Sequence, residues 1–192
     1  MDKSYQKLHK KALLYEYITI AWNIFEGIVC VTIGILSGSV VLMAYGLESG
    51  VEVFASSLVV WDLKGGKKER EKIALKLIGL AYFVVSLYIL IDAIESLLKR
   101  THPEASIPGI IFIVITVIMM MILGFGKKKI GKQMKSDTVL ADAKFTLIDG
   151  GLAGAVLVGL VLNAFFGWWW ADQVMAMFLA GVAFKEGLKE IF

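Results

Sequence analysis

Two glutamates, Glu48 and Glu52, stand near the middle of an apolar run of the sequence, YGLESGVEVFASSLVVW. In a helix, a spacing of four places both carboxylates on one face, with their Cβ atoms about 5–6 Å apart. Two like charges in apolar surroundings repel each other, and protons, a buried cation or the two in alternation can accommodate them. The pair therefore predicts a metal site coupled to protons. The alternative is that one glutamate is protonated and bonds a backbone carbonyl while the other faces a neighbouring helix.

Two aspartates lie in a later apolar run, ADAKFTLIDGG. Asp142 and Asp149 are seven residues apart, about two helical turns, so they share a face. Asp149 lies deeper, beside glycines that permit close contact between helices. Asp142 lies nearer a lysine-rich segment, where it is either a ligand at the entrance or an interfacial acid paired with Lys135 or Lys144.

The first apolar run contains Glu26, three residues after Asn23 in AWNIFEG. Either Glu26 lends an oxygen to the same cavity, or a buried Glu–Asn hydrogen bond packs the helices. A charged side chain at the middle of a bilayer costs at least about 2.5–3.5 kcal/mol, which makes such residues functional candidates. Asp92 and Glu95 approach the outer end of a span and are expected to reach water. The predicted metal-site residues are Glu48, Glu52, Asp149, Glu26, Asp142 and Asn23.

The composition indicates which elements position these acids. Of 192 residues, 58% are hydrophobic and 19% are charged, against about 45–50% and about 25% in soluble domains. A helical span takes about 20 apolar residues, so the chain has room for six or seven helices and no ordinary globular domain. We predict an all-α polytopic membrane protein, a six-helix bundle forming a single transmembrane domain over residues 1–192. The predicted spans are approximately 17–36, 40–61, 73–98, 107–125, 138–166 and 168–190.

Lysine and arginine set the predicted orientation. Fourteen of them lie in the N-terminal segment and in the connections after the second and fourth spans, whereas the opposite connections hold Lys99 and Arg100. This asymmetry places both termini in the cytoplasm and requires an even number of spans. The net charge of only +3 does not indicate a nucleic-acid partner. No nucleophile–base set is visible, so we predict neither an enzyme nor a cofactor.

The sequence resembles the cation diffusion facilitator (cation efflux) family over nearly its whole length. Glu48 and Glu52 in GLESGVEVFASS match the paired ligands of that family's second helix, and GWWWADQV at 167–174 resembles the entry to its sixth helix. The second ligand pair, on the fifth helix, matches Phe145 and Asp149, so one ligand is replaced. Trp22, Asn23 and Glu26, and ADAK at 141–144, resemble motifs of short members that lack the cytoplasmic C-terminal domain.

The resemblance implies a divalent-cation transporter of the plasma (cytoplasmic) membrane that exchanges metal for protons by alternating access, and it implies a homodimer in the lipid bilayer. Glutamates in place of Asp/His ligands make the site all-oxygen, which admits Mn²⁺, Fe²⁺ or Mg²⁺ as well as Zn²⁺ and Co²⁺. The alternative is a membrane protein that binds metal without moving it and serves as a regulator or scaffold.

Overall fold

The computed structural model describes residues 3–37, 40–65, 68–100 and 107–191, and these form six helices and no strand. The prediction of an all-α, six-helix bundle is confirmed. The helices are α1 (Lys3–Ser37), α2 (Val40–Gly65), α3 (Lys68–Lys99), α4 (Ile107–Met134), α5 (Asp137–Phe166) and α6 (Ala171–Ile191).

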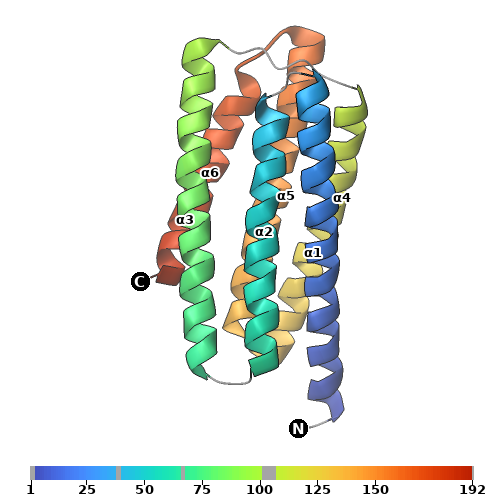
Figure 1. Cartoon of the computed structure of the whole chain (residues 1–192), viewed down its shortest axis with the longest axis vertical. Coiled ribbons are helices and arrows are strands. Elements are labelled where there is room, and N and C mark those ends of the chain that lie inside the picture. Colours follow the sequence, from blue (N-terminus) through green and yellow to red (C-terminus); the bar gives the residue numbers. More distant parts are fainter. Residues whose placement is uncertain (1–2, 38–39, 66–67, 101–106, 192) are drawn as a thin grey trace.

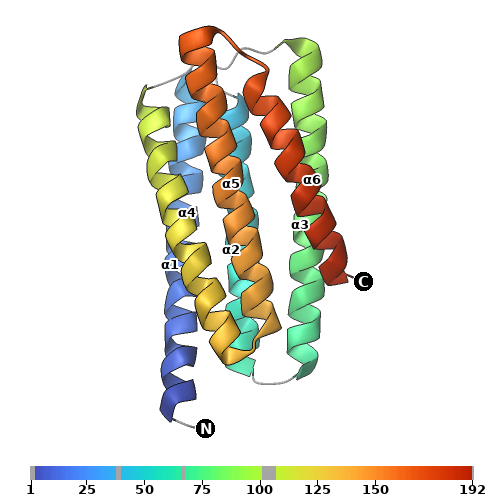
Figure 2. The ribbon, with the colours of Figure 1, turned by 180° about the vertical axis from the view of Figure 1, so that it is seen from behind.

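The helices pack in two layers of three (Figure 1). α1, α2 and α3 form one layer, and α4, α5 and α6 form the other, which Figure 2 shows from behind. The start of α1, the end of α2, the start of α3 and the α4–α5 connection lie at one end, which we call the lysine-rich end; the opposite end we call the outer end. The helix ends that carry the basic residues predicted to face the cytoplasm are therefore at a single end of the bundle, although Lys127 of α4 is buried.

Several helices extend beyond the spans predicted from hydropathy. α1 begins at Lys3 and α4 continues to Met134, because lysine, glutamate and alanine propagate a helix well outside the hydrocarbon region. α4 ends where Lys135 adopts a left-handed backbone conformation with φ of 54°, a common way to end a helix. α4 thus continues about two helical turns beyond residue 125, where the fourth span is predicted to end.

Among the described residues, four helices are long and apolar enough to cross a membrane by length and composition, namely α1, α3, α4 and α5. Large apolar side chains are exposed along the outside of the bundle, as a lipid-facing surface requires; Ile28, Val84, Ile118 and Val158 are examples from four helices. The chain is an integral membrane protein.

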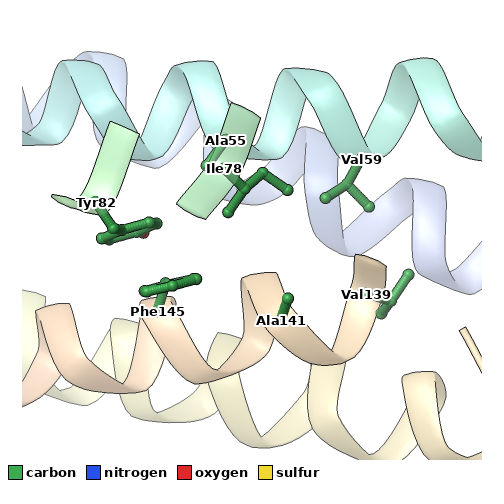
Figure 3. Close-up of a cluster of buried hydrophobic side chains, with 7 residues drawn as sticks. All are labelled: Ala55, Val59, Ile78, Tyr82, Val139, Ala141 and Phe145. Atoms are coloured by element: carbon green, nitrogen blue, oxygen red, sulfur yellow. The ribbon is translucent and has the colours of Figure 1, made fainter. Parts of the chain in front are cut away.

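An apolar cluster between α2, α3 and α5 ties the two layers together near the lysine-rich half (Figure 3). Tyr82 of α3 and Phe145 of α5 stack with ring centroids 3.6 Å apart and an interplanar angle of 9°. Ala55 and Val59 of α2 are fully buried beside them. This cluster fixes the rotation of α5, and so determines which α5 side chains face the polar interior.

α3 and α6 approach each other closely through two glycines. A Cβ atom at Gly79 would lie 2.7 Å from the carbonyl oxygen of Gly187, and one at Gly187 would lie 2.9 Å from that of Gly79. Nearby, the rings of Phe83 and Phe184 have centroids 4.8 Å apart. Small residues at the crossing allow backbone contact that larger side chains would prevent.

Candidate functional site

The α2 pair occupies two different environments. Glu52 is buried, with 1% of its surface exposed, whereas Glu48 is half-buried and lines a cavity. The two residues are one turn apart on α2, about 6 Å along the axis, with Glu48 nearer the outer end. The predicted shared face is therefore present, but only one of its carboxylates reaches the cavity.

The cavity beside Glu48 measures about 50 Å³ and lies between α2, α3, α5 and α6. Asp92 of α3 and Gln173 of α6 also line it. Gln173 is 2% exposed, and neither of its amide atoms has a hydrogen-bond partner in the described part of the chain. The outer half of the bundle thus contains a small chamber whose lining is mostly apolar and includes Glu48, Asp92 and Gln173. Asp92 lines this chamber, whereas the sequence indicated that it reaches water near the outer end of its span.

Asp149 of α5 faces the carboxylates of two other helices. It is 3% exposed, and it interacts electrostatically with Glu26 of α1 and with Glu48 and Glu52 of α2. One of its oxygens, Oδ2, lacks a hydrogen-bond partner among the described residues. Four acids from three helices therefore converge on one region between the layers, which we call the central region: Glu26, Glu48, Glu52 and Asp149.

Asn23 and Glu26 lie on the α1 side of this region and are 1% and 0% exposed. Trp22, Tyr45 and Ser49 provide the polar groups around Glu26. Within the described residues, neither Glu26 oxygen and neither amide atom of Asn23 makes a hydrogen bond. A hydrogen bond between Asn23 and Glu26, one of the two alternatives that the sequence left open, is thus not formed, and the role of Glu26 in a metal site stays a prediction.

Below Glu52, toward the lysine-rich end, a second polar group surrounds Lys127 of α4. Lys127 is 0% exposed and is the one buried lysine among the side chains that the structure describes. Its Nζ forms an ion pair with Asp142 and lies 2.9 Å from Oε2 of Glu16. It also donates to the hydroxyls of Ser56 and Thr146, each at 3.3 Å. We call these residues and Glu52 the inner network.

Thr146 joins the inner network to the α2 pair. Its hydroxyl accepts from Lys127 and donates to Oε2 of Glu52 over 3.4 Å. Three carboxylates share this group with one ammonium. In the described structure, Glu52 Oε1, Asp142 Oδ1 and both oxygens of Glu16 lack a hydrogen-bond partner. The network has more negative charge and more acceptor atoms than Lys127 satisfies.

The structure corrects two expectations about charged residues here. Lys127 is not a loop residue that flanks a span, because α4 continues past it and carries it into the bundle. Asp142 pairs with Lys127, and not with Lys135 or Lys144. Lys144 lies on the exposed side of α5 and reaches α6, with its Nζ 3.4 Å from Oε1 of Glu190 and 3.7 Å from Oε2 of Glu186.

Phe145 occupies the fifth-helix position four residues before Asp149, where the family resemblance implies a ligand. It is fully buried and stacked on Tyr82 in the apolar cluster (Figure 3). It has no atom that binds a metal. α5 therefore presents Asp149 as its carboxylate in the central region and Asp142 in the inner network.

Within the described residues, no three His, Cys, Asp or Glu side chains are arranged closely enough to hold a metal ion. The structure brings Glu26, Glu48, Glu52 and Asp149 into one region without drawing them around a common point, and it places Asp142 in the separate inner network. Their role as metal ligands stays a prediction.

Sequence reasoning missed Glu16 and Gln173, and it misplaced Lys127. For Glu16 a signal existed: residues 16, 19, 23, 26 and 30 follow spacings of three and four, and all five are buried in α1. That period marks one face of a helix. Gln173 gave no signal, because a single uncharged amide does not stand out in a hydropathy profile.

Comparison with known proteins shows likeness along nearly the whole chain. The sequence is 24% identical to transmembrane protein 163 of Xenopus laevis over 191 residues, covering 96% of this chain and 67% of that protein. It is 24% identical to the magnetosome protein MamB of Paramagnetospirillum magneticum over 188 residues, which cover 90% and 63%. It is 26% identical to the cadmium, cobalt and zinc/H(+)-K(+) antiporter of Bacillus subtilis over 189 residues, which cover 93% and 60%.

The sequence also matches the cation efflux transmembrane domain over residues 17–192. That match includes all the predicted site residues and all of the inner network except Glu16. It agrees with the six-helix bundle and with the acids that converge from α1, α2 and α5. The chain belongs to the cation efflux family.

Proposed function

We propose that this protein transports divalent metal cations across the membrane, as an exporter that exchanges the ion for protons. Glu48, Glu52 and Asp149 bind the ion, and Asn23 and Glu26 lie around it or on its path. The bundle alternates between a state open to the lysine-rich end and one open to the outer end, and protons replace the ion on the return. The protein works in the plasma membrane as a homodimer.

One observation carries this proposal: Glu52 and Asp149, on facing helices, are buried, and each has a carboxylate oxygen without a hydrogen-bond partner among the described residues. Buried charges of this kind are unfavourable unless a cation or a proton accompanies them. The outer chamber beside Glu48 supports a route toward the outer end. The Bacillus subtilis relative, whose name describes an antiporter of cadmium, cobalt and zinc, supports the substrate class.

The ligand set supports hard divalent ions. Every proposed ligand is an oxygen atom, and oxygen donors suit Mn²⁺, Fe²⁺ and Mg²⁺, while imidazole and thiolate donors favour Zn²⁺ and Co²⁺. Zn²⁺ and Co²⁺ remain in the set to be tested because carboxylates also bind them.

Flux through purified protein in proteoliposomes tests the transport proposal. Wild-type protein should carry at least one ion from a panel of Mn²⁺, Fe²⁺, Co²⁺, Zn²⁺ and Mg²⁺, and an opposing proton gradient should accelerate it. Glu48→Gln, Glu52→Gln and the double variant should lose metal-dependent flux but keep their helical content. Glu95→Gln is the matched control, because Glu95 is an exposed acid at the outer end of α3. Full transport by the double variant would refute the proposal.

A second function, metal binding without transport in a regulator or scaffold, is favoured by one observation. Phe145 fills the fifth-helix ligand position with an aromatic ring that is locked against Tyr82, so the site has fewer ligands than the family pattern implies. Calorimetry and flux on the same preparation separate the two functions. A scaffold would bind the ion in calorimetry and show no flux under any gradient.

A further inference from the structure

The inner network contains a cation of the protein's own. Lys127 Nζ contacts carboxylates from α1 and α5 and hydroxyls from α2 and α5. The ammonium is fully removed from water, and three carboxylates belong to the same network. This arrangement resembles a cation site whose occupant is tethered to α4.

We propose that Lys127 is a built-in competitor of the transported cation, whose fixed positive charge lowers the affinity of the neighbouring carboxylates for a divalent ion. The inference rests on the proposed function and adds to it a residue that sets affinity. It concerns the binding of a divalent ion by the carboxylates of the inner network, including Glu52. Lys127 itself is not a metal ligand.

Lys127 and Glu52 are connected through one side chain. A single hydroxyl, that of Thr146, separates Lys127 from Glu52, with hydrogen bonds of 3.3 Å and 3.4 Å on its two sides. Glu52 interacts electrostatically with Lys127, with Asp142 and with Glu16. A divalent ion held by Glu52 would therefore feel the ammonium through the low-dielectric interior, where charges are weakly screened.

The carboxylates of the inner network have acceptor oxygens that no donor in the described structure satisfies. Within the described structure, Asp142 and Glu52 each have one oxygen without a hydrogen-bond partner, and neither oxygen of Glu16 makes a hydrogen bond, although its Oε2 lies 2.9 Å from Lys127 Nζ. Lys127 thus contacts one oxygen of Glu16 and one of Asp142, and it reaches Glu52 only through Thr146. Without the ammonium, the same carboxylates would attract a divalent ion more strongly. A transport site must bind an ion well enough to load it and weakly enough to release it, and a fixed positive charge beside the site favours release.

The test is binding of Mn²⁺, Co²⁺ and Zn²⁺, each alone, to purified full-length protein by calorimetry. Lys127→Gln should tighten binding of the ions that the wild type binds by about tenfold or more, because one positive charge is removed from the site. Lys128→Gln is the matched control, since Lys128 is the next residue of α4 and is exposed; its affinity should equal that of the wild type.

A double variant separates charge from packing. Lys127→Gln with Asp142→Asn removes one charge of each sign, so its affinity should return to within about threefold of the wild type. If Lys127→Gln does not fold, Asp142→Asn is compared with this double variant, because the two differ only in the charge at residue 127. The double variant should bind the ion more tightly by the same factor of about ten.

The outcomes distinguish this inference from the proposed function. Equal affinity of folded Lys127→Gln and wild type overturns the competitor role and leaves the transport proposal standing. Tighter binding by Lys127→Gln in a protein that shows no flux supports the competitor role and refutes transport. If none of the three ions binds to any variant, the competitor role is overturned, and the flux assay with all five ions decides the transport proposal separately.

Discussion

Thr146 of α5 donates a hydrogen bond to Oε2 of Glu52 of α2 over 3.4 Å, and the same hydroxyl accepts from Lys127 of α4. One threonine thus joins three helices from the two layers at a buried position. The layers are linked here by polar contacts, and at the preceding residue of α5 by the Tyr82–Phe145 stack.

Removing this hydroxyl tests its structural importance. Thr146→Val keeps the shape of the side chain but deprives both Glu52 and Lys127 of a buried partner, which should lower the free energy of unfolding by about 1–3 kcal/mol. Denaturant unfolding in detergent, followed by tryptophan fluorescence, measures the change. Thr32→Val is the control, because the Thr32 hydroxyl bonds the Ile28 carbonyl on an exposed face and should change stability by less than about 0.5 kcal/mol. Equal effects of the two substitutions would contradict this prediction.

Removing the ammonium of the inner network should destabilise the fold more than replacing Lys127 together with its two ion-pair partners. Lys127→Met leaves the buried carboxylates of Glu16 and Asp142 without their ammonium, which should cost about 3–5 kcal/mol. The triple variant Glu16→Leu, Lys127→Met, Asp142→Leu removes the charges together and should lie within about 1 kcal/mol of the wild type, or above it. The same unfolding assay compares them. A triple variant less stable than Lys127→Met would show that the network is needed for folding itself.

Restoring a ligand at residue 145 should change ion preference. Phe145→His places an imidazole one turn from Asp149 and should increase the preference for Zn²⁺ over Mn²⁺ by about tenfold or more, because imidazole suits Zn²⁺. Competition calorimetry measures the ratio. Phe145→Leu is the control for loss of the Tyr82 stack, since it adds no donor atom. An unchanged ratio in the histidine variant would mean that residue 145 does not face the ion.

The α3–α6 contact depends on the absence of side chains. Gly79→Ala should destabilise the protein by about 1–3 kcal/mol, because its methyl group would meet the Gly187 carbonyl oxygen at 2.7 Å and overpacking of a close contact costs energy of this order. Gly181→Ala, on α6, is the control, since a Cβ there meets nothing within 4 Å; it should be neutral or slightly stabilising. Thermal unfolding of both variants would decide the matter, and equal midpoints would refute the close contact.

Hydropathy and charge asymmetry were sufficient to predict the class of fold. Apolar runs of about 20 residues predicted six helices. The distribution of lysine and arginine predicted which helix ends lie together at one end of the bundle. The buried acids of α2 and α5 were also recognisable, because an acid in an apolar run is unusual whatever its partners are.

The partners of those acids were not predictable from local sequence. Lys127 stands in GFGKKKIG, which reads as a basic flank, and only its contacts with α1 and α5 distinguish it from the exposed Lys128 and Lys129. Hydropathy averages over all faces of a helix, so it cannot separate a lysine that points to water from one that points to a carboxylate on a distant segment. The pairing of Asp142 was missed for the same reason.

The ring of Phe145 has a consequence for the hydration of a bound ion. With an aromatic side chain where a ligand would stand, carboxylates of α2 and α5 alone would not complete the coordination of a six-coordinate cation. An ion in the central region would keep several of its water molecules. Binding would then cost less dehydration energy than in a site that removes all of the water. This would favour ions that hold their hydration shell tightly, such as Mg²⁺.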